Sequence, residues 1–100
     1  MLCLHLEVKL QLKYGEDQTL NDALEYIKQT YGQHYVNNDG VQLMDLFFAN
    51  PEEGMVFCKT NAIKYLSRFG KKEGNNKKDL LKAIHYMVLM YHCINKMESN

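Results

Sequence analysis

The sequence lacks the features that mark several common protein classes. Its three cysteines are widely spaced, odd in number and without C-x-x-C spacing, so neither a disulfide framework nor a zinc ribbon is indicated. No apolar run approaches the roughly 20 residues of a membrane span, and the N-terminus has no continuous apolar stretch of a signal peptide. We therefore expect a soluble cytoplasmic protein with no membrane partner, in which the cysteines are small buried side chains.

Phosphate-binding and nucleophile motifs are missing as well. The chain contains no G-x-x-x-x-G-K-[ST] phosphate loop, no G-x-G-x-x-G fingerprint and no G-x-S-x-G elbow. No spacing of His, Asp and Glu resembles a zinc site. Any chemistry must therefore use a less familiar arrangement of side chains.

Net charge is also absent, but only for the chain as a whole. Residues 1–58 hold three basic and nine acidic groups, net −6, whereas residues 59–100 hold nine basic and three acidic groups, net +6. A confined basic segment favours a local anion site over a long nucleic-acid surface, so DNA is not an expected partner. Attraction between the two halves explains the same distribution equally well.

One hundred residues at 46% apolar composition predict a single domain spanning residues 1–100, with a core small enough that subunit contacts would help to stabilise it. From Leu2 to Tyr14 the even positions are apolar and the odd ones mostly polar, which predicts a half-buried strand over residues 1–14. No other segment alternates in this way. Because a lone strand leaves its backbone groups unpaired, we expect it to pair antiparallel with the strand of a second copy.

The rest of the chain has helical periodicity, so the expected fold class is mainly α (α+β), one N-terminal β-strand followed by about four helices. A turn at residues 15–18 and a capping box at Thr19 predict a first helix that stops at Gly32, followed by a loop over residues 33–40. A short helix follows from Val41 and ends at Asn50-Pro51.

Asn50 is expected to cap a third helix, with Pro51 at its first position, a hesitation at Gly54 and a stop at Gly70. Residues 71–78 are expected to form a linker, and a last long helix begins at Asp79. Apolar side chains repeat at helical spacing on these two helices and are predicted to face inward: Val56, Ala62, Ile63, Leu66 and Phe69 on the third, and Leu80, Ala83, Ile84, Met87, Val88, Tyr91 and Ile94 on the last.

Basic side chains mark one face of the third helix. Asn61, Lys64, Arg68 and Lys71 follow one another at i, i+3, i+7 and i+10. Arginine grips a phosphate through two parallel hydrogen bonds, lysine acts as a point charge, and an asparagine amide can bond a base or sugar. This cationic stripe is a candidate phosphate site, but a solvated helix face has the same composition.

The last helix repeats the pattern with Lys78, Lys82 and His85, beside which lie Asp79 and Tyr86. A histidine here could bond a phosphate or transfer a proton near neutral pH. A structural role for His85 is the plainer interpretation, and the same holds for His34.

Several short motifs occur in a fixed order: His34-Tyr35, Val41-Gln42-Leu43-Met44-Asp45, Asn61-Ala62-Ile63-Lys64-Tyr65, Arg68, Gly70-Lys71 and Asp79-Leu80-Leu81-Lys82-Ala83-Ile84-His85-Tyr86. They resemble those of a family of small bacteriophage proteins, mostly of unassigned function, that includes the nucleotide kinase of T-odd coliphages, which lacks a P-loop. The resemblance covers about residues 33–90. This chain departs from the family pattern at Thr60, where the family usually has glycine, and at Gln42, where it commonly has glutamate.

The resemblance implies a nucleotide- or phosphate-binding protein like a nucleoside monophosphate kinase, acting as a homo-oligomer, dimer or higher, in the cytoplasm of an infected bacterial host. Phosphoryl transfer depends on positioning and charge neutralisation, for which a kinase would use Mg²⁺. The residues expected to act are His34 and His85 in catalysis, Asp45 or Asp79 on the metal, and Asn61, Lys64, Arg68, Lys71, Lys82 and Tyr86 on the nucleotide or other phosphorylated small molecule.

A second hypothesis belongs to another functional class. A non-enzymatic phage effector could use the cationic helix face to sequester a nucleotide signal without transforming it, or use a free strand edge to bind and inhibit a host protein. The two hypotheses differ in whether turnover accompanies binding.

Overall fold

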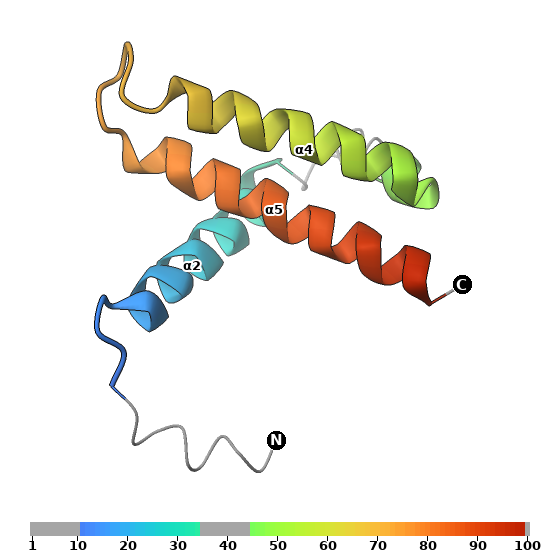
Figure 1. Cartoon of the computed structure of the whole chain (residues 1–100), viewed down its shortest axis with the longest axis horizontal. Helices are drawn as coiled ribbons and strands as arrows, with labels where there is room; N and C mark the ends of the chain where they lie inside the picture. Colours follow the sequence, from blue (N-terminus) through green and yellow to red (C-terminus); the bar gives the residue numbers. More distant parts are fainter. Residues whose placement is uncertain (1–10, 35–44, 100) are drawn as a thin grey trace.

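The computed structural model describes residues 11–34 and 45–99 of the chain, without the side chains of residues 32–34. Its helices are α2 (Glu16–His34), α4 (Pro51–Arg68) and α5 (Lys77–Glu98), and residues 45–49 add a short helical turn before α4. In Figure 1, α4 and α5 run antiparallel as a hairpin, and α2 lies across α5. The expected mainly helical fold is confirmed. None of the helices in these ranges is long and apolar enough to cross a membrane.

The predicted N-terminal strand finds no support in the structure. Its residues 1–10 lie outside the described part of the chain, and residues 11–14 contain no strand. Lys13 and Tyr14 form a turn instead, in which the Tyr14 N–H donates to a carboxylate oxygen of Glu16 at 2.9 Å. Gly15 follows with a φ of +66°, a left-handed conformation that glycine adopts without strain. The chain therefore changes direction and enters α2 directly.

Two predicted boundaries of the first helix are wrong. α2 begins at Glu16, three residues before the expected cap at Thr19, because the Gly15 carbonyl already accepts from the Thr19 N–H at 2.9 Å. Glu16 and Asp17 place negative charge in the first turn, where the helix dipole favours it. α2 also continues through Gly32 to His34, so residues 33 and 34 of the predicted loop are helical, and the remainder of that loop is not described.

The start of α4 agrees with its sequence signals. Pro51 is its first residue, and the Asn50 side chain accepts from the Glu53 N–H at 3.5 Å. The expected hesitation at Gly54 does not occur, because the helix is continuous through it. Gly54 is buried instead: a Cβ there would lie 2.8 Å from the Phe47 carbonyl oxygen and 3.2 Å from Cys93 Sγ. Its missing side chain is what lets the preceding turn and α5 approach α4.

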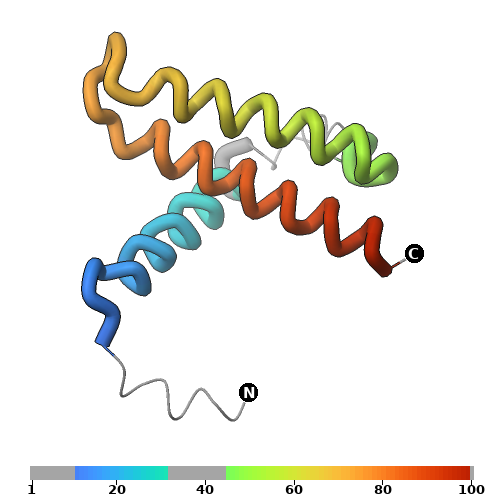
Figure 2. Tube along the Cα trace, viewed as in Figure 1, coloured from blue at the N-terminus to red at the C-terminus, as the bar shows by residue number. Residues whose placement is uncertain are grey.

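The connection between α4 and α5 is a tight turn at the tip of the hairpin (Figure 2). α4 ends at Arg68, and Gly70 at φ +84° donates its N–H to the Gly74 carbonyl at 2.8 Å. α5 begins at Lys77, two residues before the predicted start, because the Asn76 side chain caps it by accepting from the Lys78 N–H at 2.9 Å. The predicted linker over residues 71–78 is thus shorter and more ordered than expected.

Small side chains form the seam of the hairpin. Cys58 and Ala62 of α4 and Ala83 and Cys93 of α5 are all buried. Burial, with a smaller contribution from nearby Cys93, raises the pKa of the Cys58 thiol to about 11, and burial also raises the pKa of Cys93. These two thiols are therefore protonated at neutral pH, and their expected role as small apolar side chains is confirmed.

The predicted inward faces are only partly correct: Ala62 and Ala83 are buried as expected, but several larger side chains are not. Val56, Ile63 and Leu66 of α4 are exposed, although the sequence analysis assigned them to the core. Met87, Val88 and Tyr91 of α5 are exposed as well. The hairpin packs through its small residues, so these large apolar side chains are left on its surface.

Candidate functional site

Three basic side chains from two helices converge on one tyrosine. Lys64 Nζ lies 4.8 Å from the centroid of the Tyr65 ring, Arg68 Cζ lies 5.1 Å from it, and Lys82 Nζ also lies 5.1 Å from it. The first two come from α4 and the third from α5, so the antiparallel hairpin is what brings them together. Each cation near a ring face is stabilised by roughly 0.5–1 kcal/mol at an exposed site.

Tyr86 of α5 completes the group that we call the cation–aromatic cluster: Lys64, Tyr65, Arg68, Lys82 and Tyr86. The Tyr65 and Tyr86 rings are stacked, with centroids 6.0 Å apart and planes 11° apart. Both rings are half-buried, so one part of the stack supports the hairpin and another remains accessible.

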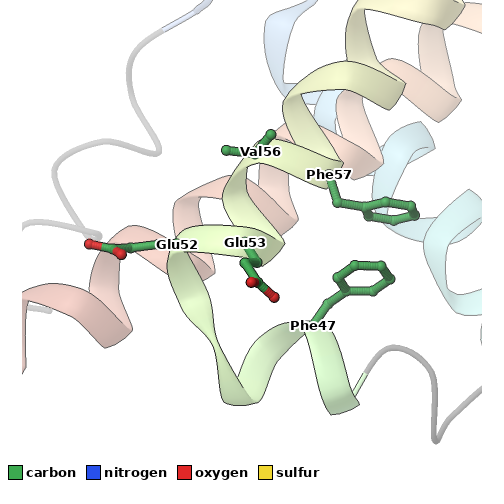
Figure 3. Close-up of a pocket in the computed structure, with 5 residues that line it drawn as sticks. All are labelled: Phe47, Glu52, Glu53, Val56 and Phe57. Carbon is green, nitrogen blue, oxygen red and sulfur yellow. The ribbon is translucent and has the colours of Figure 1, made fainter.

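An aromatic row continues from the cluster along the hairpin. Tyr86 meets Phe57 edge-on at 6.1 Å, and Phe57 stacks on Phe47 at 4.2 Å. Figure 3 shows these two phenyl rings face to face, with Glu53 beside Phe47 and Glu52 pointing away from the rings. Together with Val56 these four residues line an open groove of about 500 Å³. Its carboxylates repel anions, so a phosphate group is favoured only at the cationic end of the row.

The cations of the cluster are not neutralised by the described part of the protein. Within residues 11–34 and 45–99, the only ion pair joins Glu25 and Lys28 of α2, at 3.6 Å, and it does not involve the cluster. Lys64 and Arg68 are exposed, so water and salt screen much of the repulsion between them, and half-buried Lys82 is screened less. A bound anion would relieve that repulsion, which is the electrostatic condition for a phosphate site.

The remaining predicted phosphate ligands lie beside the cluster. Asn61 is half-buried on α4, and its Nδ2 donates to the Phe57 carbonyl oxygen at 2.9 Å, so one of its amide hydrogens is already used by the helix. Lys71 is exposed in the connecting turn, where its N–H donates to the Arg68 carbonyl at 3.0 Å. Neither is drawn into the Tyr65 contacts.

The two candidate metal ligands are far apart. Asp45 lies in the short turn before α4, at the end of the hairpin opposite to the first turn of α5, which holds Asp79 (Figure 1). Asp79 is 3% exposed, and its Oδ2 has no hydrogen-bond partner in the structure. Asp79 precedes Lys82 by three residues, so the two share one side of α5. The described residues contain no group of three or more His, Cys, Asp or Glu that could hold a metal ion.

His85 is a buried contact between helices. Its ring meets Tyr26 of α2 edge-on, with centroids 6.5 Å apart, and lies 6.3 Å from the ring of Tyr86. Burial lowers the pKa of His85 below its ordinary value of 6.5, so the imidazole is neutral at neutral pH. These contacts suit a structural role for His85, and its catalytic role stays a prediction. The side chain of His34, the last residue of α2, lies outside the described structure.

The burial of His85 predicts how stability depends on pH. In the unfolded chain His85 takes up a proton as the pH falls through 6.5, whereas the native state resists protonation, so the free energy of unfolding should decrease below that pH. We expect wild-type protein to lose more stability between pH 7.5 and 5.5 than the His85→Gln variant, as measured by urea unfolding. Equal losses in the two proteins would show that the native state accommodates the imidazolium.

Tyr65 and Phe57 are the residues that the sequence analysis did not single out as site residues. Tyr65 is three residues before Arg68, so helical spacing places that cation beside its ring, whereas the contact with the adjacent Lys64 is known only from the structure. The contact with Lys82 and the stack on Tyr86 depend on how the hairpin packs, and no sequence spacing indicates them.

Comparison with known proteins gives one result. Residues 27–88 match the model of a family described as a protein of unknown function, DUF3310. No curated protein and no solved structure matches the chain. The match carries no activity, so the resemblance to a phage nucleotide kinase stays a prediction. Because the matched segment covers more than half of the chain and contains the whole cation–aromatic cluster, the protein belongs to the DUF3310 family.

Proposed function

We propose that the protein binds a nucleotide, or another phosphorylated small molecule, at the cation–aromatic cluster. The observation that supports this most is the convergence of Lys64, Arg68 and Lys82 within about 5 Å of one tyrosine ring, without a carboxylate partner among the described residues. Structural lysines and arginines are commonly paired or dispersed, whereas three unpaired cations on one ring suit an anion.

The two parts of a nucleotide match the two parts of the cluster. Arg68 can hold a phosphate through two parallel hydrogen bonds, and the lysine ammonium groups add charge without demanding one geometry. The stacked Tyr65 and Tyr86 rings offer an aromatic surface for a base, and such stacking contributes about 1–3 kcal/mol per base. Inorganic phosphate would use only the first of these contributions.

A nucleoside monophosphate kinase is the most specific form of this proposal. Mg²⁺ bound to the phosphates would neutralise the charge that develops during transfer, and buried Asp79 is the carboxylate best placed to hold it near Lys82. Lys64 and Arg68 would orient the phosphates. A protein of this kind would act in the cytoplasm of an infected bacterial host.

Binding without turnover is the alternative, as expected of an effector that sequesters a nucleotide signal. Its specific support is that the cluster lies on an open helical surface and that the neighbouring histidine is buried against α2. A protein that only retains a ligand needs neither an exposed proton-transfer group nor a closed cavity.

Purified protein should be tested with ATP, Mg²⁺ and each deoxynucleoside monophosphate in turn, with product and bound nucleotide measured in parallel. Turnover supports the kinase, and saturable binding without turnover supports the sequestering effector. The absence of both, from protein with the circular dichroism of a folded helical chain, would show that the cluster is a solvated helix face.

A further inference from the structure

The tip of the α4–α5 hairpin is strongly basic. Residues 64–82, all within the described part of the chain, hold seven basic and two acidic groups, net +5. Three of the basic residues belong to the cation–aromatic cluster, and the others lie in the connecting turn and in the first turn of α5. The fold gathers these charges at one end of the hairpin (Figure 2). We call the whole set the basic tip: Lys64, Arg68, Lys71, Lys72, Lys77, Lys78 and Lys82.

The acidic residues of this segment do not neutralise the basic tip. Glu73 is exposed in the turn and Asp79 is buried, and the ion pair within the described residues lies on α2. The four lysines outside the cluster are all exposed. A polyanion that binds such a surface releases its condensed counterions, which favours association at low salt.

The cations of the basic tip lie at successive levels along the hairpin. Lys64 and Arg68 are one turn apart on one side of α4, about 6 Å along its axis. Lys78 and Lys82 are spaced in the same way on α5. Because Arg68 and Lys82 both approach the Tyr65 ring, they lie at about the same level of the antiparallel pair. Lys78 is therefore closer to the tip and Lys64 farther from it, so the charges form a track and not a single centre.

The basic tip also carries more charge than a mononucleotide needs. A phosphate group carries about two negative charges at neutral pH, so the three cations of the cluster already balance a nucleoside monophosphate. Lys72, Lys77 and Lys78 are in excess of that requirement. Each further nucleotide of a strand adds one phosphate charge, and a strand that crosses the tip would use these lysines as well.

The aromatic rings beside the cations favour nucleic acid over other polyanions. Tyr65 and Tyr86 stack within the cluster, and Phe57 meets Tyr86 edge-on at 6.1 Å. All three side chains are only half-buried. Unpaired bases stack on such rings, and cations that follow the backbone together with aromatic rings are the usual means of binding single strands. The bases of a duplex stack on one another instead and do not reach the rings.

We propose that the basic tip binds a short single-stranded stretch of nucleic acid, with the phosphates along the lysines and a base on the tyrosine stack. This function goes beyond the proposed binding of a nucleotide, with which it shares the cluster. Glu52 and Glu53 of the groove repel phosphates at the other end of the aromatic row, so the strand runs from the cluster toward the turn. Double-stranded DNA remains an unexpected partner, because the positive charge is confined to one end of the hairpin.

The first test measures the binding of fluorescent oligothymidylate and oligouridylate, each of about eight nucleotides, by fluorescence anisotropy. The same protein is titrated with dTMP, which reports on the cluster alone. In about 100 mM salt both strands should bind at least about ten-fold more tightly than dTMP. A plot of the logarithm of strand affinity against the logarithm of salt concentration should have a slope of about −3.5, as about five neutralised phosphates give.

The variant Lys72→Gln/Lys78→Gln removes two cations of the tip that lie outside the cluster. We expect it to bind the strands about 10- to 30-fold more weakly in about 100 mM salt, with a slope smaller by about 1.4, because each neutralised phosphate contributes about 0.7. Its affinity for dTMP should equal that of wild type. The matched control is Lys13→Gln/Lys59→Gln, which removes the same charge at exposed positions before α2 and on the far side of α4, and it should bind both ligands as wild type does.

Three results would overturn the proposal while leaving the proposed function intact. The first is a strand that binds no more tightly than dTMP, and the second is a Lys72→Gln/Lys78→Gln protein that binds strands as the control variant does. The third is displacement of the strand by inorganic polyphosphate as readily as by unlabelled strand, since the bases would then contribute nothing. Strand binding without dTMP binding would contradict the proposed function alone, and a folded protein that binds neither would overturn both.

Discussion

Replacing Arg68 with alanine is expected to weaken nucleotide binding by roughly 10- to 100-fold. Arg68 lies 5.1 Å from the centre of the Tyr65 ring, which Lys64 and Lys82 also approach. A hydrogen bond to a charged group contributes about 1.5–3 kcal/mol, which corresponds to this range of affinity. The measurement is calorimetric titration with ATP and with deoxynucleoside monophosphates at low salt, where charge contacts are least screened.

The matched control is Lys59→Ala. Lys59 is an exposed lysine of the same helix, and it lies about 180° around α4 from Arg68, so it carries equal charge on the wrong side. We expect Lys59→Ala to bind nearly as wild type does and Arg68→Lys to recover part of the lost affinity, because lysine keeps the charge but not the two parallel hydrogen bonds. If Arg68→Ala and Lys59→Ala behave alike, the cluster has no special role in binding.

Replacing Gly54 with alanine is expected to destabilise the protein by about 1–2 kcal/mol. An added Cβ would stand 2.8 Å from the Phe47 carbonyl oxygen and 3.2 Å from Cys93 Sγ. Backbone cannot move aside as a flexible side chain can, so the hairpin seam or the turn before α4 must shift, and such overpacking costs about 1–3 kcal/mol. The helix propensity of alanine returns roughly 0.5–1 kcal/mol of that loss.

Urea unfolding at pH 7.5 measures this change. Thr60→Ala, at an exposed position of the same helix, supplies the control, because it changes helix propensity without adding an atom to the seam. That variant should be as stable as wild type or slightly more so. A Gly54→Ala protein that is also more stable than wild type would mean that α4 and α5 are farther apart in solution than the structure places them.

Local chemistry decided which segments are helical and where several of them begin and end. α4 starts at Asn50-Pro51 because the Asn50 side chain accepts a hydrogen bond from the first turn and proline is well tolerated at the first helical position. Gly70 ends the helical region because it accepts a positive φ. Spacing along one helix likewise placed Lys64 and Arg68 on the same side. These features depend on neighbours within a few residues, so they can be predicted without knowing the fold.

The start of α2 shows the limit of such local signals. Thr19 and Asp22 resemble a cap, but Gly15 and Glu16 offer an earlier start, and nothing in a single sequence ranks the two. The two differ by one helical turn, and the favourable position of Glu16 at the helix N-terminus supports the earlier one. Boundaries with competing caps are therefore poorly determined by sequence.

Only the tertiary structure decided which helix faces are buried and which residues share a site. Periodicity identifies an apolar face but does not say what covers it, so Ile63 and Tyr91 were expected inside, whereas the hairpin closes through Cys58 and Cys93. The same closure brings Lys82 of α5 to the ring of Tyr65 on α4, a contact between residues 17 positions apart in sequence. How two helices pack depends on how the side chains of both fit together, compared with every other way in which the helices could pack. The order of residues along one helix does not contain that information.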